Sequence, residues 1–197
     1  MTYALPVFVH AVAAAALGVA LAAIWLADER ARRTLDAERF VRARRRVARF
    51  ERLVVPAVLV LLATGVWLVW HFYGSGGVMR SPWLAGMVAL FALQSTWARA
   101  VTVPHAARLE RLAAEALETG RVTPALAAAR TEPVPTFGHF VELPVYLLIV
   151  ALGLLKPVTW APVVAGIAAV LVAAVLATFV TQPLPRRESA GLDTSLS

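Results

Sequence analysis

Cysteine is absent from this chain of 197 residues, and charged residues make up only 16% of it. The absence of cysteine excludes a disulfide framework, thiolate catalysis, an iron–sulfur cluster and a Cys-ligated metal, which leaves histidine, methionine and carboxylates as candidate ligands. Hydrophobic residues make up 60% of the sequence, and its mean hydropathy is +0.72. These values exclude a water-soluble enzyme and a disordered chain, and they predict an all-α integral membrane protein.

Five apolar stretches are long enough to cross a bilayer, which takes about 20 helical residues. The first stretch carries its charges after the apolar run, so we expect a retained anchor and not a cleaved signal peptide. We expect one transmembrane domain over residues 1–182 and a cytoplasmic tail over 183–197. The expected spans are residues 3–27, 53–73, 83–103, 137–155 and 160–180.

The distribution of basic residues predicts how the chain is oriented. Segment 28–52 holds ten arginines and segment 99–130 holds five, while only Arg80 and Lys156 lie on the opposite side. Because basic loops stay in the cytoplasm, we expect a multi-pass protein of a bacterial inner membrane with its N-terminus outside. The short outer connections predict an up-down four-helix bundle of spans 1 to 4, with span 5 packed on its outside.

The net charge of +7 is concentrated beside the apolar spans. Anionic lipid headgroups are the expected partners of the arginine-rich segment 28–52, and nucleic acid is not an expected partner. Asp28 with Arg32, Glu29 with Arg33 and Glu38 with Arg42 are spaced i,i+4, which predicts a helical extension lying at the headgroups.

The second basic segment also has helical signals, and no separate soluble domain is expected. Apolar residues repeat with helical spacing until Gly120, a predicted C-cap, and Thr123 with Pro124 predicts the start of another helix. Residues 131–136 predict an extended linker into the fourth span, because a residue before proline avoids helical geometry.

His10 is the clearest candidate for a functional group inside the membrane. Ala14, Gly18 and Ala22 follow it at intervals of four residues, so an imidazole lies above a groove of small residues on one helix face. A haem can press against such a face with His10 as its axial ligand. The same groove can instead seat a neighbouring helix, with His10 hydrogen-bonded across the interface.

Two further residues are candidates for a second metal ligand. Met87 lies at a depth close to that of His10, and a thioether can ligate haem iron opposite histidine, although most methionines in membrane helices only pack. His71 lies near the outer end of its span among aromatic residues, where a role in the interfacial belt explains it equally well. For His105 and His139, near the inner span ends, capping or headgroup contact is a sufficient explanation, and a second site on the inner side is the alternative with less support.

Arg99 and Glu142 are charged residues predicted to lie at matching depth inside spans 3 and 4. We expect them to form an intramembrane ion pair, since charged groups inside membranes usually pair with one another. The alternative is catalytic, with Glu142 acting as a proton-accepting carboxylate at the mouth of a cofactor site.

The order of short motifs over residues 5–157 resembles that of the CopD-like and HemJ-type membrane proteins, and most closely the predicted integral membrane proteins with domain of unknown function 2269. HemJ-type proteins are haem b-binding protoporphyrinogen IX oxidases. The motifs behind His10 are Phe50-Glu-Arg-Leu-Val-Val-Pro56-Ala, Thr64-Gly65-Val-Trp-Leu, Ser81-Pro-Trp83-Leu, Val141-Glu142-Leu-Pro144 and Leu155-Lys156-Pro157.

This resemblance implies haem b as a cofactor, with His10 in the place of the family's essential first-span histidine. Met87 stands where the HemJ-type pattern Trp-Leu-x-x-Lys has its lysine, so the resemblance does not carry the oxidase activity over to this chain. Glu142 and Pro144 match the Asn-Glu-x-Pro pattern, and Val141 replaces its asparagine.

Two functions from different classes follow. The first is a haem-binding redox protein, with His10 as axial ligand and Met87 or His71 opposite. The second is a non-enzymatic membrane subunit or assembly factor, which docks a membrane protein partner or a second copy. Copper handling ranks lower, because the chain has too few methionines and histidines.

Overall fold

The structure is a computed structural model that describes residues 3–32, 37–74 and 76–181, and every regular element in this part of the chain is a helix. The predicted all-α class is confirmed, and the predicted tail over 183–197 lies outside the described residues. The elements are α1 (Ala4–Arg32), α2 (Ala37–Tyr73), α3 (Gly77–Arg80), α4 (Pro82–Trp97), η1 (Ala98–Thr102), α5 (Val103–Glu118), α6 (Pro124–Ala129), α7 (Pro133–Leu155) and α8 (Trp160–Thr181).

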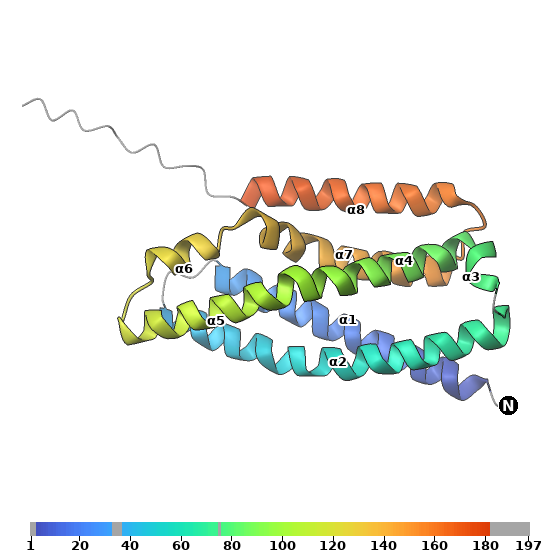
Figure 1. The fold of residues 1–197 in the computed structure, drawn as a ribbon, viewed down its shortest axis with the longest axis horizontal. Coiled ribbons are helices and arrows are strands. Elements are labelled where there is room, and N and C mark those ends of the chain that lie inside the picture. The colour runs from blue at the N-terminus through green and yellow to red at the C-terminus, as the bar shows by residue number, and fades with distance from the viewer. Residues whose placement is uncertain (1–2, 33–36, 75, 182–197) are drawn as a thin grey trace, which may run out of the picture.

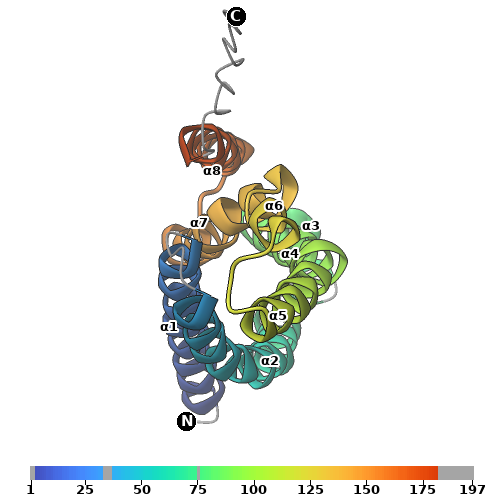
Figure 2. The same cartoon turned by 90° about the vertical axis from the view of Figure 1, so that its left-hand side faces the viewer.

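Five helical segments are long and apolar enough to cross a membrane, as the sequence predicts. The long helices run side by side, with the N-terminus and α3 at one end of the molecule and α6 at the other (Figure 1). Seen end-on, α8 lies outside the other long helices, next to α7 (Figure 2). Successive long helices run in opposite directions in the described part of the molecule (Figure 1).

The packing of the membrane helices is uneven. Helix α1 packs on both α2 and α7, and α7 packs in turn on α4 and α8. No residue of α2 between 51 and 73 is buried, and α2 has no extensive contact with α4 in the described structure. The apolar part of α2 is therefore held mainly by α1, so its remaining faces are suited to lipid or to another protein.

Close approach of helices depends on glycine, because lipid removes the usual hydrophobic drive between them. A Cβ added to Gly86 of α4 would lie 2.8 Å from Val163 Cγ1, and one added to Gly138 of α7 would lie 2.6 Å from Trp97 Nε1. Leu90, Val145, Leu152 and Val163 form the buried cluster that joins α4, α7 and α8.

At the end far from the N-terminus, residues 37–52 of α2 pack with α5 and α6 into what we call the helical cap. Helix α2 has 37 residues and is about 55 Å long, against about 30 Å of hydrocarbon, so part of it must extend beyond the bilayer. The cap has its own apolar core of Phe40, Leu109, Ala113, Ala116, Leu126 and Ala129.

The cap bears on three sequence-based expectations. Residues 37–52 are helical, as predicted, and they continue the axis of α2 (Figure 1). Residues 133–136 are not an extended linker, because α7 begins at Pro133, and proline is favoured in a first helical turn, where its missing N–H is not needed. The cap also has an apolar core of its own, which the sequence did not predict.

Local signals in the cap were more reliable. Glu38 and Arg42 form the predicted ion pair, with Oε2 and Nη1 2.8 Å apart. The Thr123 hydroxyl caps α6 by accepting a hydrogen bond from the Leu126 amide at 3.2 Å. Gly120 has a positive φ of 69° beyond the end of α5, as a C-cap glycine does. The pairs involving Arg32 and Arg33 lie outside the side chains that the structure describes.

Candidate functional site

His10 lies on α1 and faces the motif Thr64-Gly65 of α2. Its Nδ1 is 2.8 Å from Thr64 Oγ1, and the Thr64 hydroxyl donates to the Val60 carbonyl at 2.6 Å. Because that hydroxyl proton is already used, the Thr64 oxygen accepts from His10 Nδ1–H, which leaves the Nε2 lone pair available. A Cβ on Gly65 would lie 3.4 Å from His10 Cε1, so glycine gives the imidazole its space.

The small-residue groove below His10 is occupied by a side chain from α7. A Cβ on Gly18 would lie 2.9 Å from Tyr146 Cε1, and the Tyr146 hydroxyl donates to the Ala14 carbonyl at 2.5 Å. At Gly18, the groove therefore holds a side chain of the neighbouring helix α7, which is the packing alternative. A haem plane lying directly on Gly18 is not compatible with this position of Tyr146.

The two candidate second ligands lie in different surroundings. Met87 of α4 packs on α7, because a Cβ on Gly153 would lie 3.3 Å from its Cε and 3.5 Å from its Sδ. His71 is exposed near the end of α2, and its ring stacks on Trp67 with centroids 4.8 Å apart. Neither side chain has a described contact with His10.

Glu142 lies inside α7 and faces η1 and α4. Its carboxylate accepts a hydrogen bond from the Thr102 hydroxyl, and its backbone carbonyl accepts one from Gln94 Nε2 at 3.0 Å. Arg99 is exposed and forms no ion pair with Glu142 in the described structure. The predicted Arg99–Glu142 ion pair is therefore wrong.

The π-helix η1 explains this difference. Pro104 cannot donate the backbone hydrogen bond of a regular helix, and just before it the Val103 amide bonds to the Ala98 carbonyl across a wider turn. In a wider turn, residues three apart point in more divergent directions than in an α-helix. Thr102 therefore reaches Glu142 while Arg99 stays on the exposed side.

His139 is the residue at this end of the spans whose environment the sequence analysis missed. Its side chain is only 7% exposed; Nδ1 is 3.1 Å from Asp28 Oδ2, and Nε2 is 3.6 Å from Glu29 Oε2. The ring stacks on Trp25 with centroids 5.3 Å apart. Capping or headgroup contact therefore does not describe this buried imidazole. The available signal was the four-residue spacing of Trp25 and Glu29, which places both side chains on one face of α1.

Metal-binding groups do not converge in the described residues, where no set of three or more histidine, aspartate or glutamate side chains is arranged to hold an ion. A single imidazole such as His10 remains suited to an axial position on a macrocycle, which supplies the other four ligands itself.

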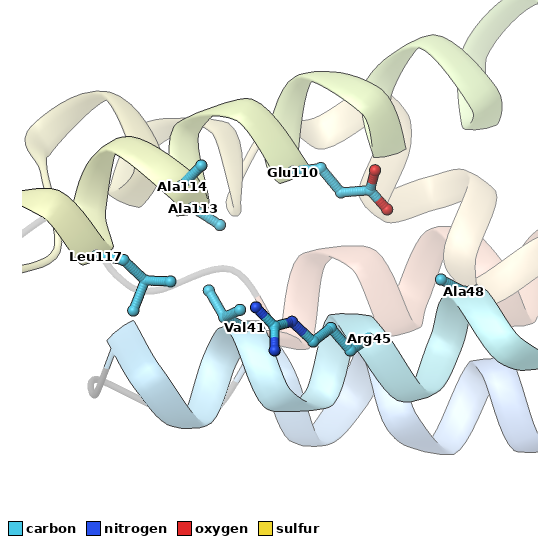
Figure 3. Close-up of a pocket in the computed structure, with 7 residues that line it drawn as sticks. All are labelled: Val41, Arg45, Ala48, Glu110, Ala113, Ala114 and Leu117. Carbon is cyan, nitrogen blue, oxygen red and sulfur yellow. The ribbon is translucent and has the colours of Figure 1, made fainter.

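The cap contains a cleft of about 320 Å³ between α2 and α5. Arg45 projects from α2 and Glu110 from α5 across this space, with Leu117 toward one end (Figure 3). Arg42, Arg45 and Arg49 are exposed along the same part of α2. These arginines of the cap therefore lie on a folded helix and not on an irregular loop.

Two of the sequence motifs meet at the opposite end of the molecule. Lys156 Nζ lies 5.6 Å from the centre of the Trp83 ring, and Trp83 also contacts Tyr73 edge to face. Lys156 ends α7 in a left-handed conformation with φ of 45°. The motifs Ser81-Pro-Trp83-Leu and Leu155-Lys156-Pro157 thus form one contact that joins the ends of α4 and α7.

Comparison with known proteins supports the membrane assignment without adding an activity. No curated protein and no solved structure matches this chain. The family model described as "Predicted integral membrane protein (DUF2269)" matches residues 5–157, which include His10, Met87 and Glu142 and end just before α8. This chain therefore belongs to the DUF2269 family of predicted integral membrane proteins.

Proposed function

We propose that this protein is a haem b-binding redox protein of a bacterial inner membrane, with His10 as the axial ligand. The observation that carries the proposal is the His10–Thr64 hydrogen bond. Histidines that ligate a metal usually donate their other ring N–H to an acceptor, which orients the ring and raises the basicity of the ligating nitrogen. Thr64 gives His10 such an acceptor, and a bound haem would supply one-electron redox chemistry.

The donor set fits one protein ligand better than two. His10 Nε2 has a lone pair and no described hydrogen-bond partner, whereas Met87 packs on Gly153 and His71 stacks on Trp67. We therefore assign the axial position to His10 and assign helix packing and the membrane interface to Met87 and His71. Because Tyr146 covers Gly18, the haem would lie beside this groove and not on it.

We further propose that Glu142 is a proton-accepting carboxylate of this redox protein. Two observations support this role. The Glu142 carboxylate faces η1, where it accepts a hydrogen bond from the Thr102 hydroxyl, and it forms no ion pair with an arginine in the described structure. A carboxylate that is not neutralised by an ion pair can take up and release a proton. Arg99 has no catalytic role in this proposal, since it is exposed.

The orientation follows from the basic residues. The cap carries most of the arginines, so we place the cap in the cytoplasm and the N-terminus outside. Helices α1, α2, α4 and α7 then form the up-down bundle, and α8 is the peripheral helix. Exposed arginines such as Arg45 and Arg49 meet anionic headgroups or a cytoplasmic partner.

A haem spectrum tests the assignment of His10. Full-length protein purified from a haem-replete host is expected to show a Soret band, and His10→Ala is expected to abolish it. His71→Ala is the matched control, because it removes an exposed imidazole and should leave the band intact. A colourless wild-type protein, or an unchanged band in His10→Ala, would overturn the proposal.

The packing of α2 favours a second candidate, a non-enzymatic subunit or assembly factor. No residue between 51 and 73 of α2 is buried, and Val66 is 67% exposed. A second copy of this chain can cover that face, and the natural absence of cysteine makes the test direct. Val66→Cys is expected to form a disulfide-linked dimer under oxidation if this candidate holds, while Val103→Cys on α5 serves as the control.

A further inference from the structure

His139 is a buried imidazole between the carboxylates of Asp28 and Glu29. Asp28 and Glu29, near the end of α1, have side chains that are 16% and 18% exposed and lie on the Nδ1 and Nε2 sides of the ring. Trp25 stacks on one face of the imidazole with an interplanar angle of 6°. The ring is therefore held in place while both of its nitrogens face carboxylates.

The Nε2 atom of His139 is buried and has no hydrogen-bond partner. Its distance of 3.6 Å to Glu29 Oε2 is too long for a direct hydrogen bond. A buried polar atom without a hydrogen-bond partner calls for an explanation, such as an ordered water, an ion or a functional role. At this separation, a water can bridge the two atoms.

Glu142 lies one helical turn further along α7 than His139, since residues three apart are neighbours on a helix. It interacts electrostatically with both His139 and Asp28. The groups that face Glu142 from α4 and η1, Gln94 and Thr102, are neutral. Asp28, Glu29, His139 and Glu142 are thus four titratable groups that lie together at this end of α1 and α7.

We propose that His139 transfers protons between the partly exposed carboxylates of α1 and the carboxylate of Glu142 inside α7. A proton from water binds the Glu29 carboxylate and moves through one bridging water to His139 Nε2, to give the imidazolium. The imidazolium then releases the Nε2 proton through water to the Glu142 carboxylate, which leaves a neutral imidazole with its Nδ1–H toward Asp28 and a carboxylic acid at Glu142. This inference rests on the proposed role of Glu142 and is independent of haem.

Time-resolved infrared spectroscopy after a pH jump tests the transfer on the full-length protein in detergent. The carbonyl band of protonated Glu142 is identified as the band that Glu142→Gln removes. In His139→Asn the band should keep its amplitude but appear at least about tenfold more slowly, since a positioned acid–base group contributes factors of this size or larger. His105→Asn is the control, because this imidazole faces Glu132 at 3.6 Å outside the site.

The outcomes separate the two claims. If wild-type protein has no band that Glu142→Gln removes, the proposed role of Glu142 is wrong and the transfer through His139 falls with it. If that band is present and forms equally fast in His139→Asn, only the inference about His139 is overturned. Should His139→Asn fail to fold, Glu29→Gln must show the same slowing, and an unchanged rate there overturns the inference.

Discussion

His10 Nδ1 and Thr64 Oγ1 lie 2.8 Å apart, so a single side-chain hydrogen bond joins α1 to α2 at the candidate ligand. The Thr64 hydroxyl donates a hydrogen bond to a backbone carbonyl of α2 and accepts one from the imidazole. The backbone of α2 therefore holds the imidazole ring in its orientation. This contact unites two motifs that the sequence showed only as separate features.

Replacing Thr64 with valine tests this contact. Thr64→Val keeps the shape but removes the acceptor, so we expect the free energy of unfolding in detergent to fall by about 1 kcal/mol. Haem affinity is expected to fall about 10- to 100-fold, as it does when second-sphere partners of metal ligands are lost. Thr96→Val is the control, since that exposed hydroxyl bonds only to the Ala92 carbonyl. Wild-type haem affinity in Thr64→Val would contradict the assignment.

Gly18 is expected to be intolerant of even one methyl group. In Gly18→Ala the new Cβ would lie 2.9 Å from Tyr146 Cε1, so α1 and α7 must separate or the tyrosine must move. Overpacking of this kind costs about 1 to 3 kcal/mol. Thermal unfolding in detergent measures the effect, and Gly76→Ala is the control, because the nearest atom there is 3.8 Å away. Equal stability of the two variants would show that the α1–α7 contact is loose.

The contribution of Glu142 to stability should be energetically coupled to that of Thr102 and not to that of Arg99. Thr102→Val removes the donor to a carboxylate inside the bundle, which is expected to cost about 1 to 3 kcal/mol. Arg99→Gln changes an exposed side chain and should alter stability by less than about 0.5 kcal/mol. Double-mutant cycles with Glu142→Gln distinguish the two partners. A large coupling energy between Arg99 and Glu142 would restore the ion pair that the structure lacks.

The cap should unfold by itself when its core is damaged. Leu126 is fully buried there, so Leu126→Ala is expected to cost about 2 to 5 kcal/mol. Arg130→Met should cost about 1 kcal/mol, because it removes the cation–π contact 4.7 Å from the centre of the Phe40 ring. Hydrogen exchange is expected to rise in α5 and α6 but not in α7 or α8. Exchange that rises equally in all four helices would mean that the cap is not a separate unit.

Local signals predicted most of the helices. Apolar length gave the five candidate spans, and turn chemistry gave the cap of α6 at Thr123 and the end of α5 at Gly120. These predictions succeed because they depend on residues close together in the chain. The boundary at Pro133 was missed because proline favours both an extended segment and the first turn of a helix, and sequence alone does not distinguish them.

The candidate sites show where that limit lies. His10 was singled out because a histidine in an apolar helix is conspicuous, but its partner Thr64 is 54 residues away. Arg99 and Glu142 were paired by depth alone, and depth does not determine direction around a helix. The π turn before Pro104 rotated Thr102 toward Glu142 and left Arg99 exposed, which no count of residues along an ideal helix predicts.

The sequence by itself determined that this chain is a helical membrane protein with five candidate spans, because transfer of apolar side chains from water depends on composition and length. It also determined which end carries the arginines. Only the tertiary structure decided that Tyr146 occupies the groove at Gly18 and that His139 lies between Asp28 and Glu29. Such contacts depend on the rotation and spacing of whole helices, which many weak packing interactions set together.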